Sequence, residues 1–135
     1  MIQSSIKMEI IADPDYVSII RLTASGIANK IGFDIDTIED LKVAISEACT
    51  NAIKHSDDDK VVIEFKEIIN GLEVEVKDSG KGYDVNSIVK PEPEELKENG
   101  LGVFIIQSLM DEVVISSNEN EGTTIRMIKY LGADK

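Results

Sequence analysis

The sequence is poor in aromatic side chains and in cysteine. Its 135 residues include no tryptophan, three phenylalanines, three tyrosines and one cysteine. So few aromatic rings predict a core built mainly from aliphatic side chains. Because there is no second cysteine, Cys49 cannot form an internal disulfide, which excludes a disulfide-held scaffold. We interpret Cys49 as a small buried residue rather than as a nucleophile.

Basic residues are also scarce. The chain has 14 lysines and arginines against 26 acidic residues, which gives a net charge of -12. This charge opposes phosphate backbones, and no local cluster of basic and aromatic residues offsets it, so we expect no direct nucleic-acid binding. If a small polyanion binds, the acidic background must be offset locally by a metal ion, by glycine backbone amides or by a few lysines.

Long hydrophobic runs are absent as well. The N-terminal stretch MIQSSIKMEI has neither a basic start nor a long apolar run, and no segment is apolar enough to span a bilayer. We therefore expect no membrane partner and a cytoplasmic protein. The shares of 42% apolar and 30% charged residues are typical of a globular chain. The length fits a single domain over residues 1–135 that buries about two thirds of its unfolded surface.

The first part of the chain predicts a strand followed by a helix. Residues 5–11 alternate loosely and favour a strand. Asp13 then offers an N-cap acceptor directly before Pro14, which is tolerated at the first helical position. Apolar residues recur at spacings of three and four up to Gly32, a residue typical of helix C-termini. We expect this helix to span residues 14–31.

A second long helix follows and ends near His55. Asp36 and Glu39 resemble a capping box at its start. An apolar stripe supports the helix and is formed by Ile38, Leu41, Ile45, Ala48 and Ala52.

The rest of the chain predicts strands, a long connection and one short helix. The stretch VVIEFKEIINGLEVEVKD reads as a β-hairpin with a type I′ turn at Asn70-Gly71. Residues 83–99 are rich in proline and acids and indicate a lid. VFIIQSLM favours a helix, and EVVISS and TTIRMIKY favour strands. We predict an α+β two-layer sandwich, with helices on one face of a mixed, mostly antiparallel sheet.

The stretch SEACTNAIKHS, residues 46–56, combines an apolar helix face with unusual polar residues. Glu47 and Asn51 are one turn apart and share one border of the buried stripe. A carboxamide oxygen there can bind Mg²⁺, and a carboxylate can orient or deprotonate a hydroxyl group. Lys54 and His55 add donors for phosphate. By itself, a Glu/Asn pair at this spacing is more typical of a solvated helix flank.

Glycines near other polar residues indicate further parts of a site. Asp78 ends a predicted strand and precedes Gly80 and Gly82, so an acceptor for an exocyclic amino group lies beside backbone that a flat ring can approach. This stretch also fits an ordinary turn.

The second glycine pair comes directly before the short helix. Gly100-Leu101-Gly102 would bring free helix amides to a phosphate, although the segment also fits a hinge. Further on, Thr123 and Thr124 follow Gly122 and offer hydroxyl groups, or simply begin a strand.

These four segments, in this order, resemble the N, G1, G2 and G3 boxes of the GHKL (Bergerat) ATP-binding fold. The stretches YVSIIRLTASGIANKIGF, IEDLKVAISEACTNAIKH and GLGVFIIQSLMDEVVI are similar to the RsbW-type anti-sigma factor serine-protein kinases. The resemblance covers residues 8–131. It implies ATP and Mg²⁺ as cofactors, with Asn51 as the Mg²⁺ ligand, Glu47 as base or orienting residue, Asp78 as the adenine reader, Gly80, Gly82, Gly100 and Gly102 as the nucleotide cradle and Thr124 as support for the adenine end.

The chain departs from some relatives in its short, acidic lid. Lys97 precedes Glu98 and Asn99 where those relatives place an arginine before the second glycine box. Neutralisation of the γ-phosphate then falls to Lys97, or to Lys54 and Lys81.

The family resemblance implies a kinase that phosphorylates a serine of a small antagonist protein and otherwise sequesters a sigma factor, as a homodimer. Arg21 on the first helix is a candidate partner contact, or a solvated side chain. One alternative is a histidine-kinase ATPase domain that acts on a separate partner, since His55 is the only histidine. Another is a non-catalytic sigma-binding protein with structural ATP.

Overall fold

The computed structural model describes residues 4–56, 59–79, 101–118 and 122–132. The predicted lid, residues 83–99, lies outside these ranges. The elements are, in chain order, β1 (Ser4–Ile11), η1 (Pro14–Tyr16), α1 (Val17–Ile31), α2 (Ile35–His55), β2 (Lys60–Ile68), β3 (Gly71–Asp78), α5 (Leu101–Leu109), β4 (Glu112–Asn118) and β5 (Gly122–Tyr130).

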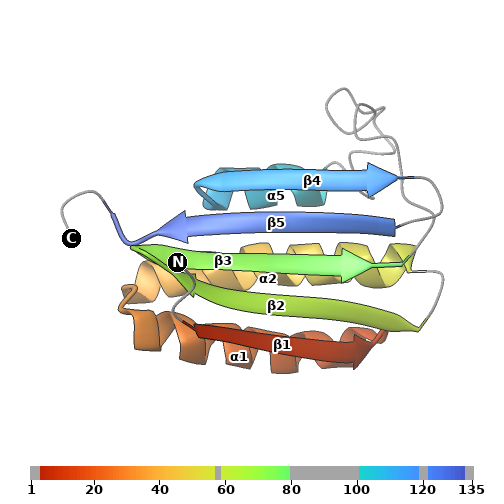
Figure 1. Ribbon diagram of the computed structural model, residues 1–135, viewed down its shortest axis with the longest axis horizontal. Helices are drawn as coiled ribbons and strands as arrows, with labels where there is room; N and C mark the ends of the chain where they lie inside the picture. The colour runs from red at the N-terminus through yellow and green to blue at the C-terminus, as the bar shows by residue number, and fades with distance from the viewer. Residues whose placement is uncertain (1–3, 57–58, 80–100, 119–121, 133–135) are drawn as a thin grey trace.

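The described strands form a five-stranded sheet in the order β1-β2-β3-β5-β4. Helices α1, α2 and α5 lie together on one face of it (Figure 1). The predicted two-layer α+β arrangement is confirmed. The predicted mixed sheet is not, because all four pairings of the described strands are antiparallel. The neighbours β3 and β5 are not consecutive in the chain, because β4 lies between them in sequence and pairs at the edge of the sheet.

The first helical segment begins and ends where the sequence predicts. The carboxylate of Asp13 accepts a hydrogen bond from the Asp15 amide at 2.9 Å and caps the 3₁₀ turn that precedes α1. Gly32 ends α1 in the left-handed region, at φ +111°, and its amide donates to the Ala28 carbonyl. Glycine suits this position because it has no Cβ to oppose a positive φ.

The start of α2 differs from the prediction. Asp34, rather than Asp36, is the N-cap, and its carboxylate accepts a hydrogen bond from the Thr37 amide at 2.8 Å. Asp36 instead lies in the first turn, where its charge favours the positive end of the helix. Aspartate is a common residue at a helix start, so Asp34 and Asp36 are both plausible caps by residue type. Only the backbone of Asp34 is extended, as an N-cap requires.

The β2–β3 hairpin is confirmed, but its turn is shifted by one residue. Ile68 pairs with Gly71, which leaves Ile69 and Asn70 as the two loop residues. Asn70 has φ +61°, whereas a type I′ turn needs positive φ at both loop residues. Gly71 serves a steric purpose, because a Cβ there would lie 2.4 Å from the Lys129 carbonyl oxygen of β5.

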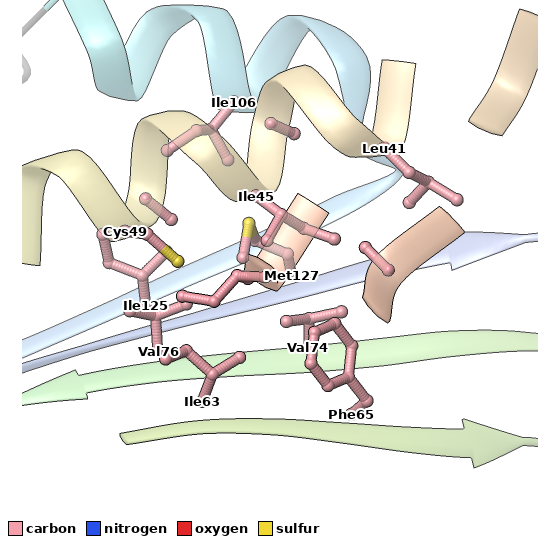
Figure 2. Packing of buried hydrophobic residues seen from close by; sticks show 14 of the residues in the cluster. Leu41, Ile45, Cys49, Ile63, Phe65, Val74, Val76, Ile106, Ile125 and Met127 are labelled. Carbon is pink, nitrogen blue, oxygen red and sulfur yellow. The ribbon is translucent and has the colours of Figure 1, made fainter. Parts of the chain in front are cut away.

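The core fills the space between the helices and the sheet. Side chains from α2 and α5, including Leu41, Ile45 and Ile106, face the sheet (Figure 2). In Figure 2, Cys49 lies close to Val76 and Ile125. Burial raises the pKa of the Cys49 thiol to about 12, so this group stays protonated at neutral pH. The interpretation of Cys49 as a packed residue is thus in agreement with the structure.

The opposite face of the sheet carries an ion-pair network. Lys66 lies at its centre and contacts Glu75 at 3.0 Å and Glu73 at 3.3 Å. Arg126 on β5 contacts Glu73 at 3.0 Å. The hydrogen bond to Glu75 raises the pKa of Lys66. Burial alone would raise the pKa of Glu75, but the hydrogen bond from Lys66 and the nearby charges of Lys66 and Lys77 outweigh it and lower this pKa.

Replacing Gly71 with alanine should destabilise the protein by about 1–3 kcal/mol, because the new methyl group would overlap the β5 backbone. Gly26 on α1 is a matched control, since a Cβ there meets no atom within 4 Å. Gly26→Ala should stabilise the protein by about 0.5–1 kcal/mol through helix propensity. Urea unfolding of both variants checks this. An equal effect of the two substitutions would contradict the close approach of Gly71 to β5.

Acidification should weaken the ion-pair network through Glu75. Because the folded-state pKa of Glu75 lies below its ordinary value of 4.5, its stabilisation is fully present above that pH and is lost as the pH falls through the lowered pKa. The free energy of unfolding of Glu75→Gln should therefore decline less between about pH 5 and about pH 3 than that of the unsubstituted protein. Glu9→Gln, at an exposed position of β1, is the control. A parallel decline in Glu75→Gln and the unsubstituted protein would show that the network does not respond to acid.

Candidate functional site

A cavity of about 240 Å³ lies between α2 and the start of α5. The spacing of four and three residues from Glu47 to Asn51 and Lys54 brings these side chains to one flank of α2. The cavity is lined by Glu47, Thr50, Asn51, Lys54, Leu101, Gly102 and Ile105. Because sites for ligands of drug size occupy about 300–1,000 Å³, this volume suits part of a nucleotide, such as its phosphates.

Asn51 is buried at this cavity, with 8% of its surface exposed. Its side-chain oxygen has no hydrogen-bond partner among the described residues. An unpaired buried acceptor costs about 1–3 kcal/mol, so such an atom usually has a ligand or another functional role. A carboxamide oxygen is a suitable ligand for a hard divalent cation.

Glu47 lies beside the first turn of α5. A Cβ placed on Gly102 would lie 3.2 Å from Glu47 Oε2, so the absence of a side chain at Gly102 leaves room for the carboxylate. The two groups come from α2 and α5, which pack together in the helical layer (Figure 1). The arrangement places a proton acceptor at the cavity wall, one helical turn from Asn51.

Positive charge at the cavity comes from Lys54 and from the start of α5. Lys54 is the one cationic residue in the described lining. The first amides of α5, from Leu101 onward, have no acceptor within the helix, and the positive end of the helix dipole lies there. Both features favour phosphate oxygens despite the acidic composition of the chain.

No cluster of three His, Cys, Asp or Glu side chains within the described ranges could hold a metal ion. A cation at Asn51 would therefore need further ligands from a bound group, as Mg²⁺ commonly takes from nucleotide phosphates. The orphaned oxygen of Asn51 and the phosphate-compatible start of α5 fit such a shared ion.

Asp78 lies outside the described lining of this cavity but at the same end of the molecule. Strand β3 and helix α2 run in the same direction (Figure 1). Asp78 lies two residues beyond Val76, and Asn51 lies two residues beyond Cys49, which is close to Val76 in Figure 2. The two side chains thus lie beyond the same part of the core, toward the C-terminal ends of their elements.

The strand register changes one predicted residue. Asp78 pairs with Thr123, and Lys77 pairs with Thr124. Paired residues of antiparallel strands project to the same face, so Thr123 shares the helix-covered face with Asp78, whereas Thr124 lies on the face of the ion-pair network. Thr124, predicted to support the adenine end, therefore does not share a face with Asp78, whereas its neighbour Thr123 does.

The structure brings some predicted residues together and leaves others apart. Glu47, Asn51, Lys54, Leu101 and Gly102 meet at the cavity. His55 ends α2 and is not in the described lining. Arg21 is exposed on α1. Gly80, Gly82, Lys81, Lys97 and Gly100 lie outside the described residues.

Two lining residues, Thr50 and Ile105, were missed. Thr50 lies three positions after Glu47 and Ile105 three positions after Gly102, so helical spacing from those residues could have identified both.

Within the described ranges, none of the helices combines the length and the apolar character that crossing a membrane requires.

Comparisons with known proteins agree with this geometry. The family model for the histidine kinase-like ATPase domain matches residues 10–129. The serine-protein kinase RsbW of Bacillus velezensis is 41% identical over 142 residues, which cover 96% of this chain and 88% of that protein. Serine-protein kinase RsbW of Bacillus thuringiensis is 43% identical over 137 residues, with 93% and 84% covered.

A crystal structure of the RsbU and RsbW domains of a Mycobacterium tuberculosis protein has a similar fold. It superposes with a TM-score of 0.72 at 20% identity and covers 96% of this chain and 33% of that longer chain. The chain therefore belongs to the histidine kinase-like ATPase domain family and, within it, to the family of RsbW serine-protein kinases.

Proposed function

We propose that this protein transfers the γ-phosphoryl group of Mg-ATP to a serine of an antagonist protein, and that it binds a sigma factor when the antagonist is not its partner. The observation that carries the proposal is the buried, unpaired oxygen of Asn51 on a cavity that also holds the Glu47 carboxylate. Membership of the RsbW family supports the serine as acceptor and the two kinds of protein partner.

The phosphate end of ATP is assigned to the cavity between α2 and α5. Asn51 would hold Mg²⁺ through its side-chain oxygen, and the ion would neutralise charge on the phosphates. Lys54 and the first amides of α5 would bind phosphate oxygens. Gly80, Gly82, Gly100 and Lys97 remain proposed parts of this cradle, and His55 a proposed second donor at its edge.

Glu47 is assigned the role of base or orienting residue. It would accept the proton of the serine hydroxyl group as the serine oxygen forms its bond to the γ-phosphorus. At the same time the bond from that phosphorus to the β,γ-bridging oxygen breaks, and ADP leaves with the electron pair. Much of the catalysis of phosphoryl transfer comes from positioning and charge, so the fixed place of Glu47 beside Gly102 favours this role.

The adenine end is assigned to Asp78 and Thr123. A carboxylate accepts a hydrogen bond from an exocyclic amino group, and a hydroxyl group can donate one to a ring nitrogen. Both side chains project from the helix-covered face at the end of β3 toward which α2, the helix that carries Asn51, also runs. An ATP molecule would then extend from the α2–α5 cavity to the ends of β3 and β5.

Helix α1 is proposed as a partner-binding element. Arg21 is exposed, and the next residue, Leu22, has 74% of its surface exposed, so α1 offers both a cationic and an apolar contact. An acidic or amphipathic surface of a protein partner fits this combination. A homodimer and a cytoplasmic location complete the proposal, and membership of the family supports both.

Glu47→Gln should lower the rate of serine phosphorylation by about 10²- to 10⁴-fold while leaving ATP affinity within a few-fold, because the amide cannot take the serine proton. The assay incubates the protein with Mg-ATP and its antagonist protein and locates phosphate by mass spectrometry. Glu39→Gln is the matched control, since Glu39 is an exposed acid on the same helix. Its rate should be unchanged.

The phosphorylated product separates the proposed function from its alternatives. Phosphoserine on the antagonist supports the proposal. Phosphohistidine on a partner protein would replace it with a histidine-kinase activity, and tight sigma binding without any transfer would replace it with a non-catalytic role. A full rate in Glu47→Gln would remove Glu47 from the chemistry.

Asn51→Leu should make the nucleotide-free protein more stable and abolish Mg²⁺-dependent ATP binding. Removing an unpaired buried oxygen is expected to add about 1–3 kcal/mol to the free energy of unfolding. Chemical denaturation without nucleotide measures the first effect, and titration calorimetry with Mg-ATP measures the second.

Asn29→Leu, at an exposed position of α1, controls for the higher helix propensity of leucine. It should leave ATP binding intact. If Asn51→Leu is destabilising yet still binds Mg-ATP normally, the carboxamide oxygen is not the ligand of the cation.

A further inference from the structure

Polar side chains form a row across adjacent strands at the end of the sheet where Asp78 lies. Thr123 on β5 pairs with Asp78 on β3 on one side and with Ser117 on β4 on the other. All three residues therefore project to the helix-covered face. The next row along the same strands is apolar and consists of Val76, Ile125 and Ile115. The polar row is thus the boundary between the core and the proposed adenine end.

Thr123 is buried, with 3% of its surface exposed, and its hydroxyl group is hydrogen-bonded to that of Ser117. The two oxygens are 2.9 Å apart. A hydroxyl group has a single proton, so the direction in which Thr123 donates depends on what its other neighbours supply. When Ser117 donates to Thr123, the Thr123 proton is left for an acceptor on the side away from Ser117.

The backbone holds this row closely. Gly122 has φ +88°, and a Cβ there would lie 2.1 Å from the Asp78 carbonyl oxygen. Strands β3 and β5 therefore approach each other more closely at this point than a residue with a side chain would allow. The close backbone approach constrains the positions from which the Asp78 and Thr123 side chains start.

We propose that Ser117 is a positioning residue that makes the Asp78–Thr123 pair selective for adenine. Ser117 directs the Thr123 hydroxyl proton toward the nucleotide, so that the pair presents one acceptor, the Asp78 carboxylate, and one donor, the Thr123 hydroxyl group. The Watson–Crick edge of adenine offers the matching donor at its 6-amino group and the matching acceptor at N1. Ser117 acts through Thr123 and does not itself contact the base.

Purines with a 6-oxo group present the reversed pattern. Hypoxanthine and guanine carry an acceptor at position 6 and an N1–H donor, so an acceptor would meet an acceptor and a donor would meet a donor. A site whose buried polar groups are left unpaired rejects such a ligand strongly. ITP is the sharper probe of the two, since it differs from ATP at this edge alone. The inference rests on the proposed binding of ATP at this site.

The test measures dissociation constants of ATP and ITP, each with Mg²⁺, by titration calorimetry. The ratio of the ITP constant to the ATP constant should fall about three- to tenfold in Ser117→Ala, as expected for one hydrogen bond. Ser117→Thr, which keeps the hydroxyl group, should retain the ratio of the unsubstituted protein. Ser116→Ala is the matched control, because Ser116 is the neighbouring serine of β4 and pairs with Thr124 on the opposite face.

A double-mutant cycle separates positioning from simple structural support. Thr123→Val should lower the ratio at least as much as Ser117→Ala, and adding Ser117→Ala to Thr123→Val should change nothing further, since Ser117 acts through Thr123. Additive losses would overturn the inference. So would an unchanged ratio in Ser117→Ala, including the case in which its melting temperature falls and both nucleotides weaken equally.

Results for the unsubstituted protein distinguish the two levels of the proposal. If it binds ATP tightly and rejects ITP while Ser117→Ala keeps that preference, the inference about Ser117 is wrong and the proposed function stands. If it binds neither nucleotide, the proposed function fails and the inference fails with it.

Discussion

The buried side-chain oxygen of Asn51 is the feature on which the functional interpretation of the structure depends. It lies on α2 between turns that are packed into the core. Burial without a donor costs about 1–3 kcal/mol, which is a large part of the marginal stability of a domain. The core offsets this cost, and a cation bound with nucleotide phosphates would remove it.

The two faces of the sheet differ in character: one carries an ion-pair network, and the other carries the core and the groups proposed to bind the nucleotide. On the outer face, Lys66 gathers Glu73 and Glu75 into a network that satisfies charged side chains without a second helical layer. On the helix-covered face, apolar rows fill the core and end at the row of Asp78 and Thr123. The groups proposed to bind adenine therefore lie where the apolar rows stop.

The sequence predicted the elements well because their signals are local. Helical spacing identified α1 and α2, and the asparagine and glycine between two strand-like runs identified the β2–β3 hairpin. The sequence did not predict details that depend on backbone geometry, such as the N-cap residue of α2. Asp34 and Asp36 have the same capping chemistry, and only the extended backbone of Asp34 makes it the cap. The turn at Asn70 is likewise shifted because Gly71 is needed where β5 approaches β3.

For the candidate site, too, the sequence predicted what depends on local spacing and not what depends on the pairing of distant strands. Glu47, Asn51 and Lys54 were found from one helix, because their spacing alone brings them together. The adenine role was predicted for Thr124 rather than for its neighbour Thr123, since the face to which a strand residue projects depends on a register that spans 45 residues from Asp78 to Thr123. A shift of one residue moves a side chain to the other face of a sheet. Where two similar residues are adjacent in a strand, the sequence alone does not tell which of them projects to a given face of the sheet.

The most direct test of this account is a crystal structure of the protein with Mg²⁺ and a non-hydrolysable ATP analogue. The account predicts a cation within about 2.0–2.1 Å of the Asn51 side-chain oxygen, shared with phosphate oxygens in the cavity between α2 and α5. An analogue bound elsewhere, or bound in this cavity with the Asn51 oxygen still lacking a partner, would contradict it.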